Sequence, residues 1–222
     1  MKKRLGTSIL NYAVTSNHIH LVIRDVKGEE VIPQTMQLIA GRTGQEYNQR
    51  KGRKGAFWED RYHATAVEVD SHLIRCLVYV DLNMVRAGVV NHPSEWSFCG
   101  YNEIQNPRQR YSIIDHEGLM ALFGTRSLDE LKKTYGSFVE EALQKQGRER
   151  DARWSESIAV GSEAFVIDTK ERLGIKAVGR EVMGGGEGSY ELREPKVPYK
   201  ANFQAENGDL SEENAFSWDE ST

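Results

Sequence analysis

The feature that most constrains the fold is a pair of strand-like runs near the start of the chain. Residues 8–14 (SILNYAV) and 18–24 (HIHLVIR) are rich in apolar and β-branched residues, and a three-residue polar link, TSN, joins them. A link of this length with asparagine in last place suits a tight turn. The sequence therefore predicts an antiparallel hairpin, which any fold of this chain must accommodate.

The second run carries two histidines one residue apart. Residues i and i+2 of a strand point to the same face, so His18 and His20 are expected to project together. Ile19, Leu21 and Ile23 share the other face, which we expect to be the buried one. Two neutral imidazoles side by side supply half of a divalent metal site. The alternative is a pair of half-exposed histidines on the solvent face of a sheet.

A tyrosine and an asparagine about sixty residues later could complete such a site. Tyr79 and Asn83 are four residues apart in a segment with helical periodicity, so they share one helix face. Arg75 and Arg86 extend the same stripe. A hydroxyl, an amide and two guanidinium groups suit the binding of a phosphodiester, and the alternative is an ordinary polar helix face.

A basic segment with interleaved aromatic residues lies between these two regions. Such a pattern suits single-stranded nucleic acid, because charges follow the phosphates and rings stack on bases. The formal net charge of −4 does not exclude this, since binding depends on the local field and the acidic excess lies in the second half of the chain. The alternative is a solvated loop whose aromatic residues belong to the core. The residues concerned are Arg50, Lys51, Arg53, Lys54 and Arg61, with Tyr47, Phe57, Trp58 and Tyr62.

The remaining pattern predicts a domain followed by an accessory region and a tail. We assign residues 1–108 to the main domain, 109–183 to a helical accessory region and 184–222 to a flexible acidic tail that starts with a glycine-rich connection. Helices are predicted over 33–48, 72–86, 128–144 and 163–174, a loop over 49–55, a strand over 65–69 and an irregular packed segment over 87–106.

Composition excludes two classes of protein. No run of eighteen or more apolar residues is present, so the sequence predicts no membrane-spanning helix. Cys76 and Cys99 lie in apolar surroundings without metal-type spacing, which indicates reduced core residues of a cytoplasmic protein.

Four motifs occur in an order that is typical of one family. Over residues 8–105 the chain resembles the REP-associated tyrosine transposases, members of the HUH single-tyrosine (IS200-like) transposase superfamily. This resemblance implies an α+β fold with a ferredoxin-like antiparallel sheet and helices on one face, here followed by a helical C-terminal extension. The motifs are NHIHLVI (17–23), YNQRKGRKGAFWEDRY (47–62), YVDLNMVRAGVV (79–90) and WSFCGY (96–101).

The resemblance also implies a set of site residues and a chemistry. His18 and His20 match the histidine pair, Asn83 the third metal ligand and Tyr79 the nucleophile. The metal would be Mg²⁺ or Mn²⁺, and the substrate single-stranded or hairpin DNA at repeats. Tyr79 would form a 5′-phosphotyrosine and release a 3′-OH, and strand transfer would reverse this step. The implied DNA-binding residues are Arg50, Lys51, Arg53, Lys54, Arg61, Arg75 and Arg86.

The chain departs from the family at its start and at two motifs. Family members usually carry a strand and a helix before the strand that begins here near Ser8. Their absence predicts a misassigned start, a remnant gene or a partner that covers an exposed sheet edge. Thr15-Ser16-Asn17 replaces the usual Met-Pro-Asn, and Asn83-Met84-Val85 replaces Asn-Pro-Val; both changes are local.

Two other functions remain open from the sequence. One is a catalytically inactive, truncated or domesticated DNA-binding relic of such a transposase. The other is an unrelated His-x-His metalloenzyme, which would bind zinc without dependence on Asn83. The target DNA, the cut position and the oligomeric state, a homodimer included, are not determined by the sequence.

Overall fold

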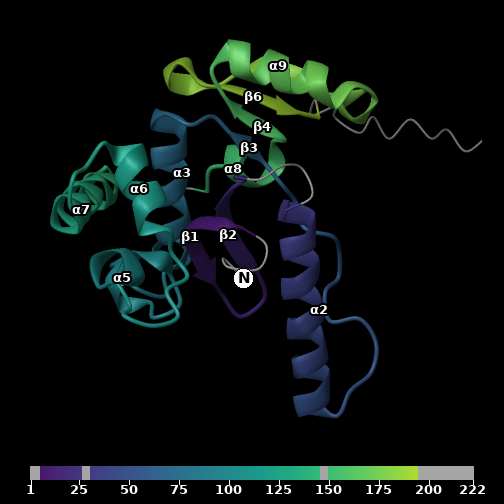
Figure 1. Cartoon of the computed structure of the whole chain (residues 1–222). Coiled ribbons are helices and arrows are strands. Elements are labelled where there is room, and N and C mark those ends of the chain that lie inside the picture. Colours follow the sequence, from purple (N-terminus) through teal and green to yellow (C-terminus); the bar gives the residue numbers. More distant parts are fainter. Residues whose placement is uncertain (1–5, 27–30, 146–149, 195–222) are drawn as a thin grey trace, which may run out of the picture.

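The protein has an α+β fold, as predicted (Figure 1). The structure, a computed structural model, describes residues 6–26, 31–145 and 150–194. None of the described helices is long and apolar enough to cross a membrane. The first elements are β1 (Ser8–Val14), β2 (Ile19–Arg24), α2 (Val31–Lys51), β3 (Ala66–Val67), α3 (Ser71–Asp81) and α4 (Asn83–Arg86). A helical middle follows, with η1 (Pro93–Glu95), α5 (Gly100–Gln105), α6 (His116–Phe123) and α7 (Leu128–Gln144). The last elements are α8 (Arg153–Glu156), β4 (Ala159–Gly161), α9 (Glu163–Leu173), η2 (Gly174–Ala177), β5 (Glu181–Gly184), η3 (Gly186–Gly188) and β6 (Tyr190–Arg193).

The predicted hairpin is confirmed. Strands β1 and β2 pair antiparallel from Ser8 opposite Arg24 to Val14 opposite Ile19, with one register shift between Ile9 and Asn11. The turn closes with a 2.9 Å hydrogen bond from the Thr15 amide to the His18 carbonyl. The polar link therefore forms the predicted tight turn, which reverses the chain in three residues.

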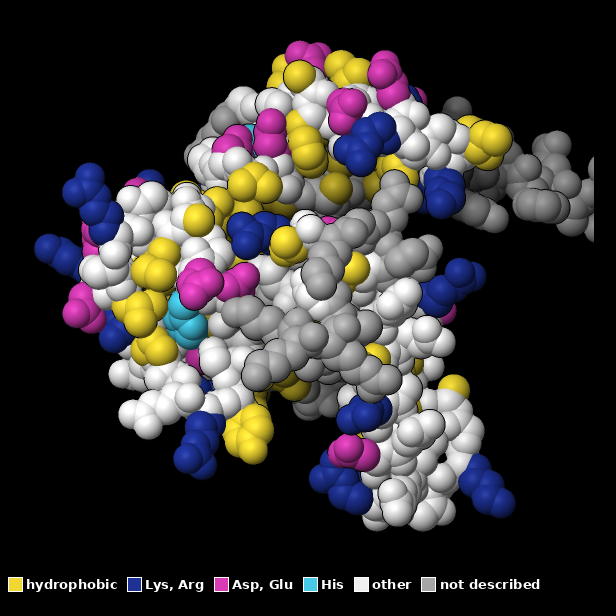
Figure 2. All heavy atoms as spheres, viewed as in Figure 1, with side chains coloured by type: hydrophobic (Ala, Val, Ile, Leu, Met, Phe, Trp, Pro, Cys, Tyr) yellow, Lys and Arg dark blue, Asp and Glu magenta, His cyan; other side chains and the backbone are white. Residues whose placement is uncertain are grey.

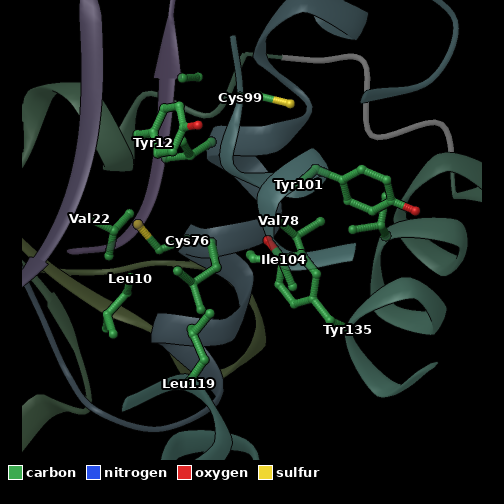
Figure 3. Packing of buried hydrophobic residues seen from close by; sticks show 14 of the residues in the cluster. Leu10, Tyr12, Val22, Cys76, Val78, Cys99, Tyr101, Ile104, Leu119 and Tyr135 are labelled. Atoms are coloured by element: carbon green, nitrogen blue, oxygen red, sulfur yellow. The ribbon is translucent and has the colours of Figure 1, made fainter. Parts of the chain in front are cut away.

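The prediction of which β2 face is buried was wrong. Val22, on the histidine face, is only 8% exposed, whereas Ile19, Leu21 and Ile23 are partly exposed. The physical reason is helix α3, which packs on this hairpin and places Cys76 in the same core cluster as Val22. Figure 3 shows Val22 on the side of β2 that faces Cys76. His20 therefore lies half-buried under the helical segment that carries Asn83, whereas His18 at the turn is exposed.

The C-terminal region is not purely helical, which corrects a second prediction. Strands β4, β5 and β6 join β3 in a four-stranded sheet of order β3-β4-β6-β5, in which β3 and β4 are parallel and the other pairs antiparallel. The segment 184–188, predicted to be a flexible connection, is ordered: Gly184 ends β5, and η3 (Gly186–Gly188) turns the chain toward β6. Strands this short carry too little alternation to be recognised from sequence. The rest of the predicted tail, from residue 195, lies outside the described residues.

Helix starts follow the side-chain caps that the sequence offers. Asp70 accepts a hydrogen bond from the His72 amide, and Ser127 and Ser162 cap α7 and α9 in the same way. The predicted helix over 72–86 is interrupted at Leu82, so that it forms α3 and α4. Helix α2 continues to Lys51, so residues 49–51 of the predicted loop are helical.

A polar network lies inside the main core. Asn11 is fully buried and donates through Nδ2 to the Leu77 carbonyl at 2.9 Å and to the Tyr135 hydroxyl at 3.1 Å. Tyr135 in turn donates to the carboxylate of Asp81, which also accepts from the Tyr101 amide at 3.1 Å. The network ties β1, α3, α5 and α7 together around apolar residues such as Ile104 and Leu119, shown in Figure 3.

Asp81 predicts how stability depends on pH. Burial raises the pKa of Asp81 from 3.8 to about 7, against opposing hydrogen bonds from Tyr135 and the Tyr101 amide. Between these two values the folded protein holds a proton that the unfolded chain has released, so the free energy of unfolding falls as pH rises from about 4 to about 7. Urea unfolding across this range should show a flatter profile for Asp81→Asn, by up to about 1.4 kcal/mol per pH unit. Parallel profiles would contradict this.

Position 100 is predicted to tolerate no side chain larger than that of glycine. A Cβ there would lie 2.0 Å from Oδ1 of Asn11 and 3.1 Å from the Tyr12 nitrogen, and Asn11 cannot move because the network holds it. Gly100→Ala is expected to lower the free energy of unfolding by about 3 kcal/mol or more in urea titrations. Gly41→Ala, in helix α2 with open space around it, is the matched control and should stabilise by about 0.5–1 kcal/mol. Equal effects of the two substitutions would refute the steric explanation.

Candidate metal and tyrosine site

The two histidines lie together, as their spacing predicted. The rings of His18 and His20 are 4.9 Å apart between centroids and almost perpendicular, at 89°. His18 is exposed at the turn, whereas His20 is half-buried beneath the helical segment that carries Asn83. One ion could therefore be reached by both rings from the solvent side.

Hydrogen bonds set the tautomers of both rings. The Oδ1 atom of Asn17 is 2.7 Å from Nδ1 of His18 and can only accept, so the His18 proton sits on Nδ1 and the Nε2 lone pair is free. Nδ2 of Asn83 donates to Nε2 of His20 at 3.0 Å, which marks this nitrogen as the acceptor. Both rings thus carry an unprotonated Nε2, which on His20 becomes a ligand atom once the Asn83 amide rotates away.

His20 stays neutral at physiological pH. Burial, followed by the neighbouring His18 and the Arg86 guanidinium, lowers the pKa of His20 to about 4. Only a neutral imidazole nitrogen can bind a metal ion, so this environment keeps the group in its ligand form.

Tyr79 and Asn83 lie one helical turn apart, although they belong to α3 and α4. Their side chains have different neighbours. Asn83 contacts His20, and the half-buried Tyr79 ring carries the Arg86 guanidinium over it, 3.7 Å from the ring centroid. A second ring, that of Trp154, has its centroid 6.2 Å from that of Tyr79.

The donor set fits a divalent ion. Two imidazole nitrogens and, after rotation of its amide, the Oδ1 atom of Asn83 offer a mixed nitrogen and oxygen site of the kind that Mn²⁺ accepts and Mg²⁺ tolerates with added water. The 3.0 Å contact between Asn83 and His20 brings together groups that are 63 residues apart in sequence. Asn83 is thus close enough to His20 to serve as a third metal ligand.

A second cluster of side chains that could bind a metal has a structural role instead. Glu68, Asp70 and His72 each offer one ligand atom within 4.8 Å of the others. Asp70, however, caps α3 and contacts Nδ1 of His72 at 2.7 Å, and Glu68 accepts from the amide and hydroxyl of Ser162 at the start of α9. His72 also lies two helical turns, roughly 10 Å along the axis, from Tyr79. These groups hold β3, α3 and α9 together.

The predicted DNA-binding residues fall into two groups. Figure 2 shows Lys and Arg side chains around the end of α2 that projects from the body in Figure 1. The exposed residues Arg50, Lys51, Arg53, Lys54 and Arg61 belong to this end and the loop after it. Arg53 lies over Tyr47 at 5.7 Å, and Phe57 and Trp58 pack with α2, so these aromatic rings are engaged with the helix. The structure does not bring this group to the histidines.

The other two arginines lie on the tyrosine helices. Arg75 donates back to Ser71 on the exposed surface of α3. Arg86 is half-buried against Tyr79 and is the one predicted DNA-binding residue in contact with the tyrosine.

Sequence reasoning missed two residues of the site. Asn17, which fixes the tautomer of His18, could have been found from its position next to a histidine in a tight turn. Trp154 has no such signal, because only the packing of the C-terminal region brings it to Tyr79.

Comparison with known proteins gave a match to a family model. Neither the comparison with curated proteins nor that with solved structures gave a match. Residues 1–83 match a family model described as "Transposase IS200 like". The matched segment begins before the hairpin, ends at Asn83 and so includes both histidines and Tyr79. The match supports a relationship of this part of the chain to the IS200-like transposases.

Proposed function

We propose that this chain is a metal-dependent DNA transposase that cleaves and rejoins single-stranded DNA at hairpin-forming repeats through a 5′-phosphotyrosine on Tyr79. The observation that carries the proposal is the 3.0 Å contact between Asn83 and His20, with Tyr79 one turn away on the same helical segment. The match of residues 1–83 to IS200-like transposases supports a DNA-processing enzyme.

Each residue has a defined task in this reaction. His18, His20 and Asn83 would hold Mg²⁺ or Mn²⁺, which would supply polarisation of the scissile phosphate. The Tyr79 oxygen attacks phosphorus, the bond to the 3′ oxygen breaks, and that oxygen leaves as a 3′-OH while the phenol gives up its proton. Attack by another 3′-OH on the phosphotyrosine joins the two DNA strands, and its proton returns to the phenol of Tyr79. Each phosphodiester broken is thus replaced by one that is formed.

The basic residues bind DNA at two places. The exposed basic group on α2 and the following loop supplies sequence-independent attraction to phosphates at a distance from the tyrosine. Arg75 and Arg86 act next to Tyr79. A homodimer is compatible with this assignment, and the action takes place on nucleoid DNA in the cytoplasm of a bacterium.

A covalent adduct tests the proposal. The protein is incubated with Mn²⁺ and single-stranded oligonucleotides that cover the DNA flanking its gene on both sides. Products that survive denaturation are digested with trypsin. Cleavage after Arg75 and Arg86 gives the peptide CLVYVDLNMVR, in which Tyr79 is the sole tyrosine. A mass increase equal to the 5′-phosphorylated DNA fragment downstream of the cut, on this peptide and dependent on Mn²⁺, is the expected result.

The alternative, a DNA-binding relic, gives a different outcome. Such a protein shifts the same oligonucleotides in a gel but forms no adduct at any Mn²⁺ concentration. That result would replace the proposed cleavage with binding alone.

A further inference from the structure

Arg86 stands apart from the other basic residues because of its contact with Tyr79. It ends α4, and helical side chains lean toward the N-terminus, so it reaches back over two turns to the tyrosine. The guanidinium carbon lies 3.7 Å from the ring centroid, well inside cation–π distance. This contact fixes the orientation of the phenol.

The charge of Arg86 has no close carboxylate partner within the described part of the chain. Its Nη2 nitrogen is buried and has no hydrogen-bond partner among the described residues, and none of their carboxylates lies within 4.0 Å. Asp151 acts on it only at longer range and pairs instead with Arg153 at 2.8 Å. A buried cationic donor without a partner is costly, and a bound anion would remove that cost.

The surroundings of Arg86 extend beyond the segment that matches the family model. Arg86 and Trp154 both lie outside residues 1–83, and Trp154, from α8, packs against the main core and beside Tyr79. The side-chain cluster of Tyr79, Arg86 and Trp154 is therefore assembled from two distant parts of the chain.

We propose that Arg86 is a substrate-binding residue that holds Tyr79 in place and binds a non-bridging oxygen of the DNA phosphate that the tyrosine attacks. This inference rests on the proposed function and deepens it. A guanidinium presents paired donors to phosphate, and the attacked phosphate gains negative charge in the transition state. Arg86 would stabilise that charge from the side of Tyr79, in addition to the stabilisation by the metal ion.

Salt dependence of DNA binding tests the phosphate contact without any need for cleavage. The probe is a fluorescein-labelled oligothymidylate of about 20 nucleotides, with affinity measured by anisotropy over a range of salt in the absence of divalent ions. Each phosphate contact on single strands contributes about 0.7 to the slope of log K against log salt. Arg86→Gln and Arg86→Met should each reduce the slope by about 0.7, and Arg86→Lys should keep it.

Arg172→Gln is the matched control, because this exposed arginine on α9 pairs with Asp168 and lies outside the cluster. Its slope should equal that of the wild type. An unchanged slope in both neutral Arg86 variants, or a wild type that does not bind the probe, would overturn the inference. Arg86→Met keeps the apolar stem, so at least one folded neutral variant is expected, and circular dichroism verifies it.

A second readout separates this inference from the proposed function. At saturating repeat DNA and Mn²⁺, Arg86→Gln should form the Tyr79 adduct about 100-fold more slowly than the wild type. If the wild type forms the adduct and the Arg86 variants show unchanged slopes and rates, the proposed role of Arg86 is refuted, and the proposed function stands. A reduced slope without any wild-type adduct retains the phosphate contact and refutes cleavage.

Discussion

Tyr79→Phe is expected to abolish the covalent DNA adduct, with a rate at least about 10³-fold below that of the wild type. The substitution removes only the hydroxyl that would attack phosphorus. The ring stays, and with it the contacts to Arg86 and Trp154, so unfolding in urea should change by no more than about 0.5 kcal/mol. DNA affinity, measured by anisotropy, should stay within a few-fold of the wild type.

Tyr111→Phe is the control for loss of a tyrosine hydroxyl. Tyr111 is 92% exposed and distant in sequence from the site, so adduct formation should be unaffected. An adduct formed by Tyr79→Phe at the wild-type rate would assign the nucleophile to another residue. Loss of DNA binding together with the adduct would instead make Tyr79 a binding residue.

His20→Ala is expected to remove metal binding and, with it, adduct formation by at least about 10³-fold. His20 is the half-buried member of the histidine pair, burial keeps it neutral, and its Nε2 atom meets Asn83. Its removal leaves one exposed imidazole, which holds a divalent ion weakly. Titration of Mn²⁺ followed by electron paramagnetic resonance should show an affinity at least about 100-fold lower than that of the wild type.

Asp70→Asn distinguishes the two candidate metal sites. Asparagine keeps the cap of α3 but removes the carboxylate from the cluster of Glu68, Asp70 and His72. We expect Mn²⁺ affinity to be unchanged. Tight Mn²⁺ binding by His20→Ala together with weak binding by Asp70→Asn would place the ion at that cluster.

Local sequence predicted the pieces of the site well. Alternation and a polar link suffice for the hairpin, since side-chain period and turn chemistry act within a few residues. The caps at Asp70, Ser127 and Ser162 also act over two or three residues; α7 and α9 begin where predicted, and α3 begins one residue earlier. Four-residue spacing placed Asn83 one turn from Tyr79.

Two of the errors, the buried face of β2 and the missed second sheet, share a cause, which is contact between distant segments. The face of β2 that carries Val22 is buried because α3 packs on it, and no pattern within β2 contains this information. Strand β3 pairs with β4 across about ninety residues, so the second sheet could not be read from either segment alone.

The sequence by itself determined the hairpin, the helix starts and the residue types of the site, because these depend on neighbours within one turn or one strand pair. Tertiary structure alone decided three contacts: Asn83 meets His20, Arg86 lies half-buried over Tyr79 with its Nη2 donor unpaired among the described residues, and the Trp154 ring lies near that of Tyr79. These contacts follow from burial of apolar surface and from pairing of buried polar groups across the whole chain, which no local pattern encodes.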